Sequence, residues 1–245
     1  MIVEELLDHT RKEYLDDFTE LLEGDDDRLW SDEVLCRHFN EGSRILCRRA
    51  WLLIETGVAP AGVISLVEGK TVYSLHKSVL RVYKATPADT EFRLGRVSEE
   101  ALDTRLPADP ETPFDINTPD TTTPGYPRAI ATDAGTRRLR VYPAPSADEA
   151  GLKLNLKIAR LPLRLLSVDD IQAHPELDEQ WHESLCKYAA GKCLTSPKSG
   201  DVDARTQGRE WLKEFYDDVK LARQERMRAE MAPVRIQHAS STAYI

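Results

Sequence analysis

No stretch of this sequence is apolar for the roughly 20 residues that a helix needs to cross a bilayer. The acidic first residues also lack the basic and apolar regions of a signal peptide. These two absences predict a cytosolic protein without a membrane partner. The hydrophobic content of 41% is still enough to bury a core.

The sequence also lacks the common catalytic motifs. It has no Gly-x-Gly-x-x-Gly, no Gly-x-x-x-x-Gly-Lys, no Gly-x-Ser-x-Gly and no His-Glu-x-x-His. His182 and Glu183, beside Trp181, could serve as an acid/base pair only if a cleft surrounded them. We therefore predict no catalytic residue and no cofactor, and keep an uncharacterised cytosolic enzyme as a minor alternative.

Cysteine is scarce, and each of the four cysteines falls inside a predicted helix. Cys36, Cys47, Cys186 and Cys193 are therefore expected to be buried, reduced thiols rather than disulfides. His182 and Cys186 share a helix face, but no CxxC or closely spaced His pair supplies further ligands. We predict no metal site.

Negative charge is concentrated at one end of the chain. Residues 1–33 carry 13 acidic and 3 basic side chains, so the remainder of the chain is close to neutral although the net charge is −9. Asp25, Asp26 and Asp27 lack the spaced ligands of a calcium loop and are interpreted as a solvated connection between helices. The overall charge does not favour a surface that grips phosphates.

Helical spacing marks both ends of the chain. An apolar stripe predicts a first helix from Val3 to Leu22, and Ser31 is placed to cap a second helix that continues to about Gly57. A short link makes residues 1–57 a helical hairpin. A third helix is predicted to follow Pro175, and a last helix spans 201–231. Residues 167–231 are expected to complete a bundle with the hairpin.

The middle of the chain, residues 58–166, has the composition of an antiparallel β module. Short segments rich in Val, Ile, Tyr and Thr are separated by turn residues such as Glu68-Gly69-Lys70. A Pro-rich stretch at 107–127 is interpreted as an irregular loop, and residues 98–102 as a short helix. The predicted strands are 62–66, 71–75, 79–86, 91–97, 128–132, 138–142 and 152–158.

Two features of this plan point to a partner. Lys153 and Lys157 alternate with leucines, and together with Arg138 and Arg140 they form a candidate basic docking face, although a solvated face is the simpler interpretation. After the last helix, residues 232–245 lose helical spacing but keep apolar and aromatic residues, which favours an extended tail that docks on a partner. The tail residues predicted to dock are Pro233, Val234, Ile236, Tyr244 and Ile245. The fold class is thus α+β, a helical bundle from the two ends with an inserted antiparallel β module and an extended C-terminal tail.

Three short motifs resemble a known family. The helix at residues 31–42 resembles an early helix of the head-to-tail adaptor, or connector, proteins of tailed bacteriophages. Residues 125–129, followed by 138–145, are similar to a strand, Tyr-Pro-x-Pro and strand arrangement in their β region. Residues 181–189 resemble the helix that follows. The similarity spans most of residues 30–222.

The resemblance implies a structural ring of usually twelve copies, which docks beneath the portal protein and receives tail proteins on its other side. It implies a virion protein of the neck, made in the host cytoplasm, with a channel through which DNA passes without specific binding. Asp25, Asp26 and Asp27 would suit a surface that faces this channel, because negative charge repels phosphates. Another virion ring component, such as a collar or tail-tube or tail-completion protein, is the alternative that shares these features.

Overall fold

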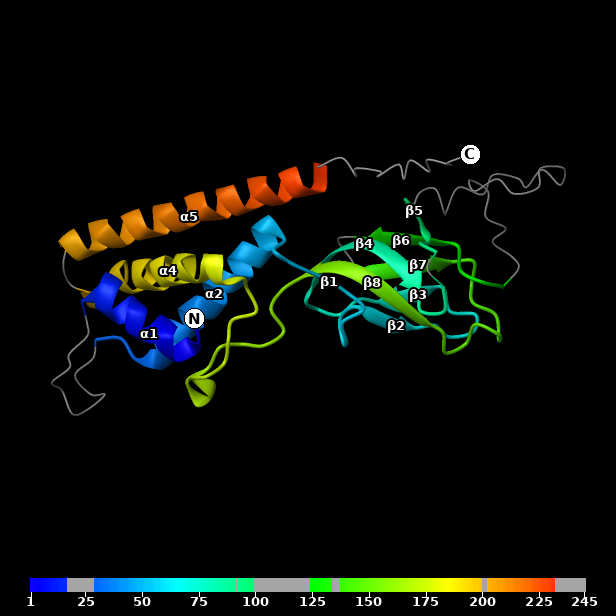
Figure 1. The fold of residues 1–245 in the computed structure, drawn as a ribbon, viewed down its shortest axis with the longest axis horizontal. Helices are drawn as coiled ribbons and strands as arrows, with labels where there is room; N and C mark the ends of the chain where they lie inside the picture. The colour runs from blue at the N-terminus through cyan, green and yellow to red at the C-terminus, as the bar shows by residue number, and fades with distance from the viewer. Residues whose placement is uncertain (17–28, 91, 99–123, 134–136, 200–201, 232–245) are drawn as a thin grey trace, which may run out of the picture.

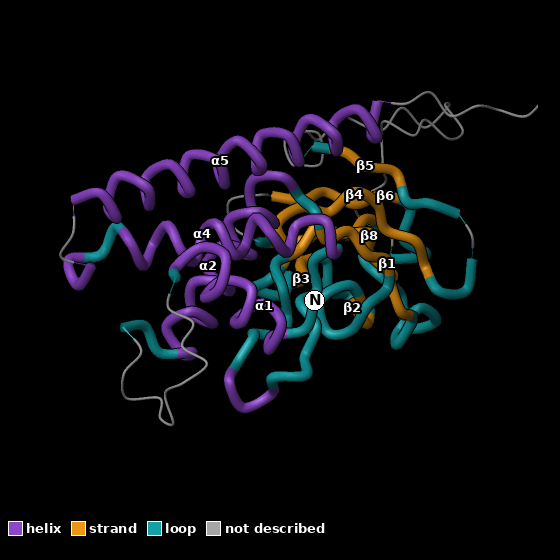
Figure 2. Tube along the Cα trace, turned by 60° about the vertical axis from the view of Figure 1, so that its left-hand side comes forward, coloured by secondary structure: helices purple, strands orange, loops and turns teal. Residues whose placement is uncertain are grey.

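A computed structural model of the chain describes residues 1–16, 29–90, 92–98, 124–133, 137–199 and 202–231. Two regions lie side by side along its longest axis, one helical and one of β-strands (Figure 1). The strands, orange in Figure 2, gather next to the helices. The α+β class is confirmed, whereas the residue boundaries of the four predicted segments stay a prediction.

The helical region contains α1 (Val3–Thr10), continued by the π-helical turn η1 (Arg11–Leu15), α2 (Asp32–Ala50), α4 (His182–Leu194) and α5 (Val202–Met231). Helix α4 lies at its centre and packs against the other three. Nine of its 13 residues are buried, as expected for a helix surrounded on most sides. Short 3₁₀ turns, η3 (Val168–Asp170), η4 (Glu179–Trp181) and η5 (Pro197–Ser199), flank α4.

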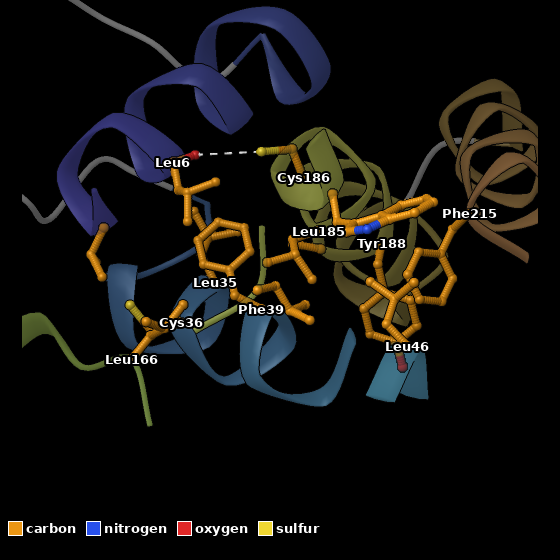
Figure 3. Packing of buried hydrophobic residues seen from close by; sticks show 14 of the residues in the cluster. Leu6, Leu35, Cys36, Phe39, Leu46, Leu166, Leu185, Cys186, Tyr188 and Phe215 are labelled. Carbon is orange, nitrogen blue, oxygen red and sulfur yellow. Dashed lines mark hydrogen bonds between the residues drawn. The ribbon is translucent and has the colours of Figure 1, made fainter. Parts of the chain in front are cut away.

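The helical core is built from large side chains of all four helices. Figure 3 shows Leu6 of α1, Phe39 of α2 and Leu185 of α4 close together, and all three are fully buried. The rings of Tyr188 and Phe215 are tilted against each other with centroids 4.7 Å apart, which joins α4 to α5. Burial of these side chains supplies the main stabilisation of this region.

The β region consists of two small sheets. In the first, called the β8 sheet, β8 (Lys153–Arg160) pairs antiparallel with β1 (Leu53–Thr56), β2 (Val63–Ser65) and β4 (Val79–Pro87). In the second, called the β7 sheet, the order is β3 (Val72–Ser74), β7 (Arg138–Tyr142), β6 (Ala129–Asp133) and β5 (Gly95–Val97). Leu139 and Val141 of β7 share one buried cluster with Leu154 and Leu156 of β8, so the two sheets enclose a common core.

Several sequence-based expectations are corrected by the structure. The first helix ends at Leu15, because Asp16 adopts a left-handed conformation with φ of 48°. The second ends at Ala50 rather than Gly57, because Trp51 has φ of 54° and the chain then enters β1. The chain from Pro175 to Asp178 is not helical, the 3₁₀ turn η4 begins at Glu179, and α4 begins only at His182.

The strand predictions are confirmed in position but not in all their pairings. The turn at residues 68–70 forms, with a hydrogen bond from the Lys70 N–H to the Val67 carbonyl, yet β2 and β3 on its two sides belong to different sheets. The predicted strand at 91–97 shortens to β5, which pairs with β6 in parallel rather than antiparallel. The last helix, α5, is confirmed over almost its whole predicted range.

Helices α4 and α5 approach most closely where two glycines face each other. A Cβ atom on Gly208 would lie 2.8 Å from Cβ of Leu194, and one on Gly191 would lie 2.9 Å from the Gly208 carbonyl oxygen. Distances this short leave no space for a methyl group. The crossing therefore depends on glycine at both positions.

The substitution Gly208→Ala should lower the free energy of unfolding by about 1–3 kcal/mol, because overpacking outweighs the better helix propensity of alanine. Urea denaturation followed by circular dichroism measures this change. Gln207→Ala, at the exposed neighbouring position, is the matched control and should have little effect. A Gly208→Ala protein as stable as the original would contradict the close crossing.

Candidate functional site

The two regions are joined at a buried ion pair. Arg160, the last residue of β8, is only 4% exposed. Its Nε donates to Glu55 Oε2 and its Nη2 to Glu55 Oε1, each at 2.8 Å, which is the two-pronged geometry that guanidinium and carboxylate favour. Its Nη1 donates to the Glu176 carboxylate. One cation thus connects β1, β8 and the segment that leads back to the helices.

Glu176 also shapes that returning segment. Its Oε1 accepts hydrogen bonds from the backbone N–H groups of Leu163 at 2.7 Å and Arg164 at 2.6 Å. Burial alone would disfavour the charged guanidinium, but the hydrogen bonds to Glu55 and Glu176 outweigh it and raise the pKa of Arg160. The arginine therefore stays charged at every pH at which the protein is folded.

Aromatic rings surround Arg81 on the side of the β region that the far end of α5 approaches. The Arg81 guanidinium of β4 lies 4.9 Å from the ring centroid of Trp51 and 5.0 Å from that of Tyr83. Burial and the neighbouring Glu230 of α5 raise the pKa of Tyr83. Helix α5 therefore reaches from the helical region to the side of the β region, as Figure 1 shows.

An open groove of about 480 Å³ runs between α2 and residues 165–168. Asn40 lines the groove and joins its two sides, because its side-chain amide exchanges two 2.8 Å hydrogen bonds with the backbone of Leu166. Its rim carries both signs of charge, from Glu33, Arg37, Glu41 and Arg44. The groove thus combines a fixed floor with a mixed-charge rim.

The four predicted basic residues are divided between the two sheets. Arg138 and Arg140 lie on β7, on either side of the buried Leu139, so their side chains project from the outer face of the β7 sheet. Lys153 and Lys157 project likewise from the outer face of the β8 sheet. The structure brings Lys157 opposite Lys84 of β4, a residue that sequence reasoning missed. Any docking role of either pair remains a proposal.

Of the candidate acid/base and metal residues, His182 and Cys186 are buried in the helical region, whereas Glu183 is exposed. The Nε2 of His182 is 3.0 Å from the Leu177 carbonyl, and burial lowers the pKa of this histidine. Glu183 instead accepts a hydrogen bond from the Tyr14 hydroxyl at 3.1 Å. Within the described residues, no group of three or more His, Cys, Asp or Glu side chains is placed to hold a metal ion.

The four cysteines are free and buried, as predicted. The Sγ of Cys186 contacts the Leu6 carbonyl at 4.0 Å (Figure 3). Burial raises the pKa of Cys36 to about 11 and that of Cys47 and Cys186 to about 12, so these thiols are protonated at neutral pH and unreactive.

Other predictions fall outside the described residues. These are the acidic residues Asp25, Asp26 and Asp27, the short helix at 98–102, the larger part of the 107–127 loop, and the tail with Pro233, Val234, Ile236, Tyr244 and Ile245. In the described part of the chain, no helix has both the length and the apolar character that a bilayer crossing requires.

The chain is a structural adaptor of bacteriophages, because a family of phage head-to-tail adaptors matches almost its whole length. The chain belongs to the SU10 adaptor protein family, whose sequence model matches residues 1–237. The resemblance drawn from the short motifs is thereby confirmed. No curated protein matches the chain.

The substitution Arg160→Met should lower the free energy of unfolding by roughly 3–5 kcal/mol, because it leaves the carboxylates of Glu55 and Glu176 without their cation in a partly buried site. Chemical denaturation measures the loss. The matched control is Lys220→Met, which removes an exposed ion pair with Asp217 and should cost about 1 kcal/mol or less. Equal effects of the two substitutions would contradict the role of Arg160.

Proposed function

We propose that this protein forms a ring between the portal and the tail of the phage particle, docks on the portal protein and receives tail proteins on its other side. The observation that carries the proposal is the match of a head-to-tail adaptor family over residues 1–237. A structural adaptor in the virion is the activity of that family. Ring formation, usually with twelve copies, is what the resemblance of the short motifs to head-to-tail adaptors implies.

The described surfaces are compatible with a ring. Closed rings of identical subunits use two different complementary faces on each subunit. The helical region and the β region lie side by side and differ in architecture, so one chain offers two different faces (Figure 1). The large buried cores of both regions make each of them a firm platform for contacts.

The ring would leave a central channel for DNA. An acidic lining repels phosphates and lets the genome pass without adhering. Asp25, Asp26 and Asp27, which lie outside the described residues, have the charge for this lining. DNA would then pass through the ring without a specific binding site.

Mass measurement tests the proposed function. Light scattering of the purified chain, alone and mixed with the portal protein of the same phage, should give a complex whose mass equals a portal ring plus a ring of this chain. A chain that remains separate from the portal at all concentrations would contradict the portal-docking function. A ring that forms but contacts only other neck components would favour a collar or tail-completion role instead.

Deletion of residues 232–245 should leave the unfolding midpoint of the isolated subunit nearly unchanged and weaken portal binding or ring assembly. The reason is that a segment that orders on binding contributes to the complex and little to the isolated fold. Thermal unfolding and portal titration measure the two effects. A large fall in the melting temperature of the truncated subunit would place the tail in the core instead.

A further inference from the structure

The outer face of the β8 sheet carries three lysines, Lys84, Lys153 and Lys157, called the lysine face. Strand register sets Lys84 of β4 directly opposite Lys157 of β8. Lys153 lies four residues before Lys157 and therefore on the same side of the strand. The adjacent pair Ala85 and Leu156 points the other way and is fully buried, so the lysines face outward.

Like charges directly opposite each other on a sheet are destabilising. Within the described residues, none of the three lysines makes an ion pair, and Thr86 and Asn155, the next cross-strand pair on this side, are neutral. The face therefore combines an unfavourable charge arrangement with the absence of an ion-paired carboxylate in the described part of the subunit. An external anionic partner would relieve the repulsion.

An acidic surface lies on the helical region, formed by Glu4, Asp8, Asp169 and Asp170 and called the acidic face. Glu4 and Asp8 are one turn apart on α1, and both are exposed. The backbone N–H of Glu4 donates to the Ile171 carbonyl at 3.0 Å, which holds α1 against the segment that carries the two aspartates. All four acids are exposed, and although Lys12 follows in η1, the face keeps an excess of negative charge.

Each subunit thus carries opposite charges on its two regions. A ring of identical subunits needs a heterologous contact, in which one face of a subunit meets a different face of its neighbour. Nucleic acid is the other anion that lysines could bind, but DNA would leave the acidic face without a role. A second copy of this chain accounts for both faces.

We propose that the lysine face of one subunit docks on the acidic face of the next, as the contact that closes the ring. This inference rests on the proposed ring-forming function and names the residues that carry it. The contact is electrostatic and exposed at its rim, so it sets the specificity of the docking and the rate of association. Association should weaken as salt rises, because charges are screened beyond about 10 Å at 0.1 M ionic strength.

Charge reversal tests the contact. The triple variant Lys84→Glu, Lys153→Glu, Lys157→Glu should self-associate on the order of 100-fold more weakly than the original protein at low salt, because attraction becomes repulsion. Analytical ultracentrifugation measures association, and circular dichroism confirms folding. Serine at the same three positions removes attraction without adding repulsion, so it should produce a smaller loss in the same direction.

A second variant reverses the other face with Asp8→Lys, Asp169→Lys and Asp170→Lys. This variant should self-associate more weakly than the original protein by a similar factor. An equimolar mixture of the two reversed variants should associate near the original level, because every contact in an alternating ring again joins opposite charges. The matched control reverses three exposed cations elsewhere, with Lys77→Glu, Arg209→Glu and Lys213→Glu, and should associate like the original protein.

Three results would overturn the inference. The first is normal association of either reversed variant, including the case in which the lysine variant loses only DNA binding. The second is a mixture that associates no better than its components. The third is an original protein that self-associates neither alone nor on the portal. Portal binding is measured in parallel, so normal portal rings from all variants would leave the adaptor function intact while rejecting this contact.

Discussion

The relation between the two regions depends on the buried guanidinium of Arg160. The chain crosses from helix to sheet just before β1 and returns just after β8, and Arg160 binds a carboxylate from each crossing. Burying such a network costs desolvation energy, which the hydrogen bonds of Arg160 to Glu55 and Glu176 offset. The contact holds the returning segment against β1 and β8.

Helix α5 runs along the helical region toward the β region (Figure 1). Its 30 residues make a rod of about 45 Å. The first half packs on α4 through the glycine crossing and Phe215, and the far end approaches Tyr83 of β4. The lysine face and the acidic face lie on the two regions of one subunit, as the heterologous contacts of a closed ring require.

Local patterns in the sequence predict the elements of this fold well and their partners poorly. Residues 202–231 form a helix because their apolar spacing matches one helix face, and β8 alternates because one side is buried. Leu53 and Ile54 suit either structure, so the end of α2 could be recognised only from the pairing of β1 with β8. That pairing joins residues about 100 positions apart, as register in a sheet is set by distant contacts.

The lysine face also could not be predicted in full from local sequence patterns. The alternation of Lys153 and Lys157 was visible, but Lys84 joins them only through the register of β4. The grouping of four cations into one face was likewise a local inference, and the two-sheet topology separates them. Family membership, in contrast, followed from short motifs that the match over residues 1–237 confirms.

A reconstruction of the phage neck at side-chain resolution would show whether this chain is the ring between portal and tail. We expect a closed ring of this chain in direct contact with the portal, with the β region of each subunit against the helical region of its neighbour. A particle in which this chain is absent from the junction, or in which it lies along the tail tube without touching the portal, would contradict it.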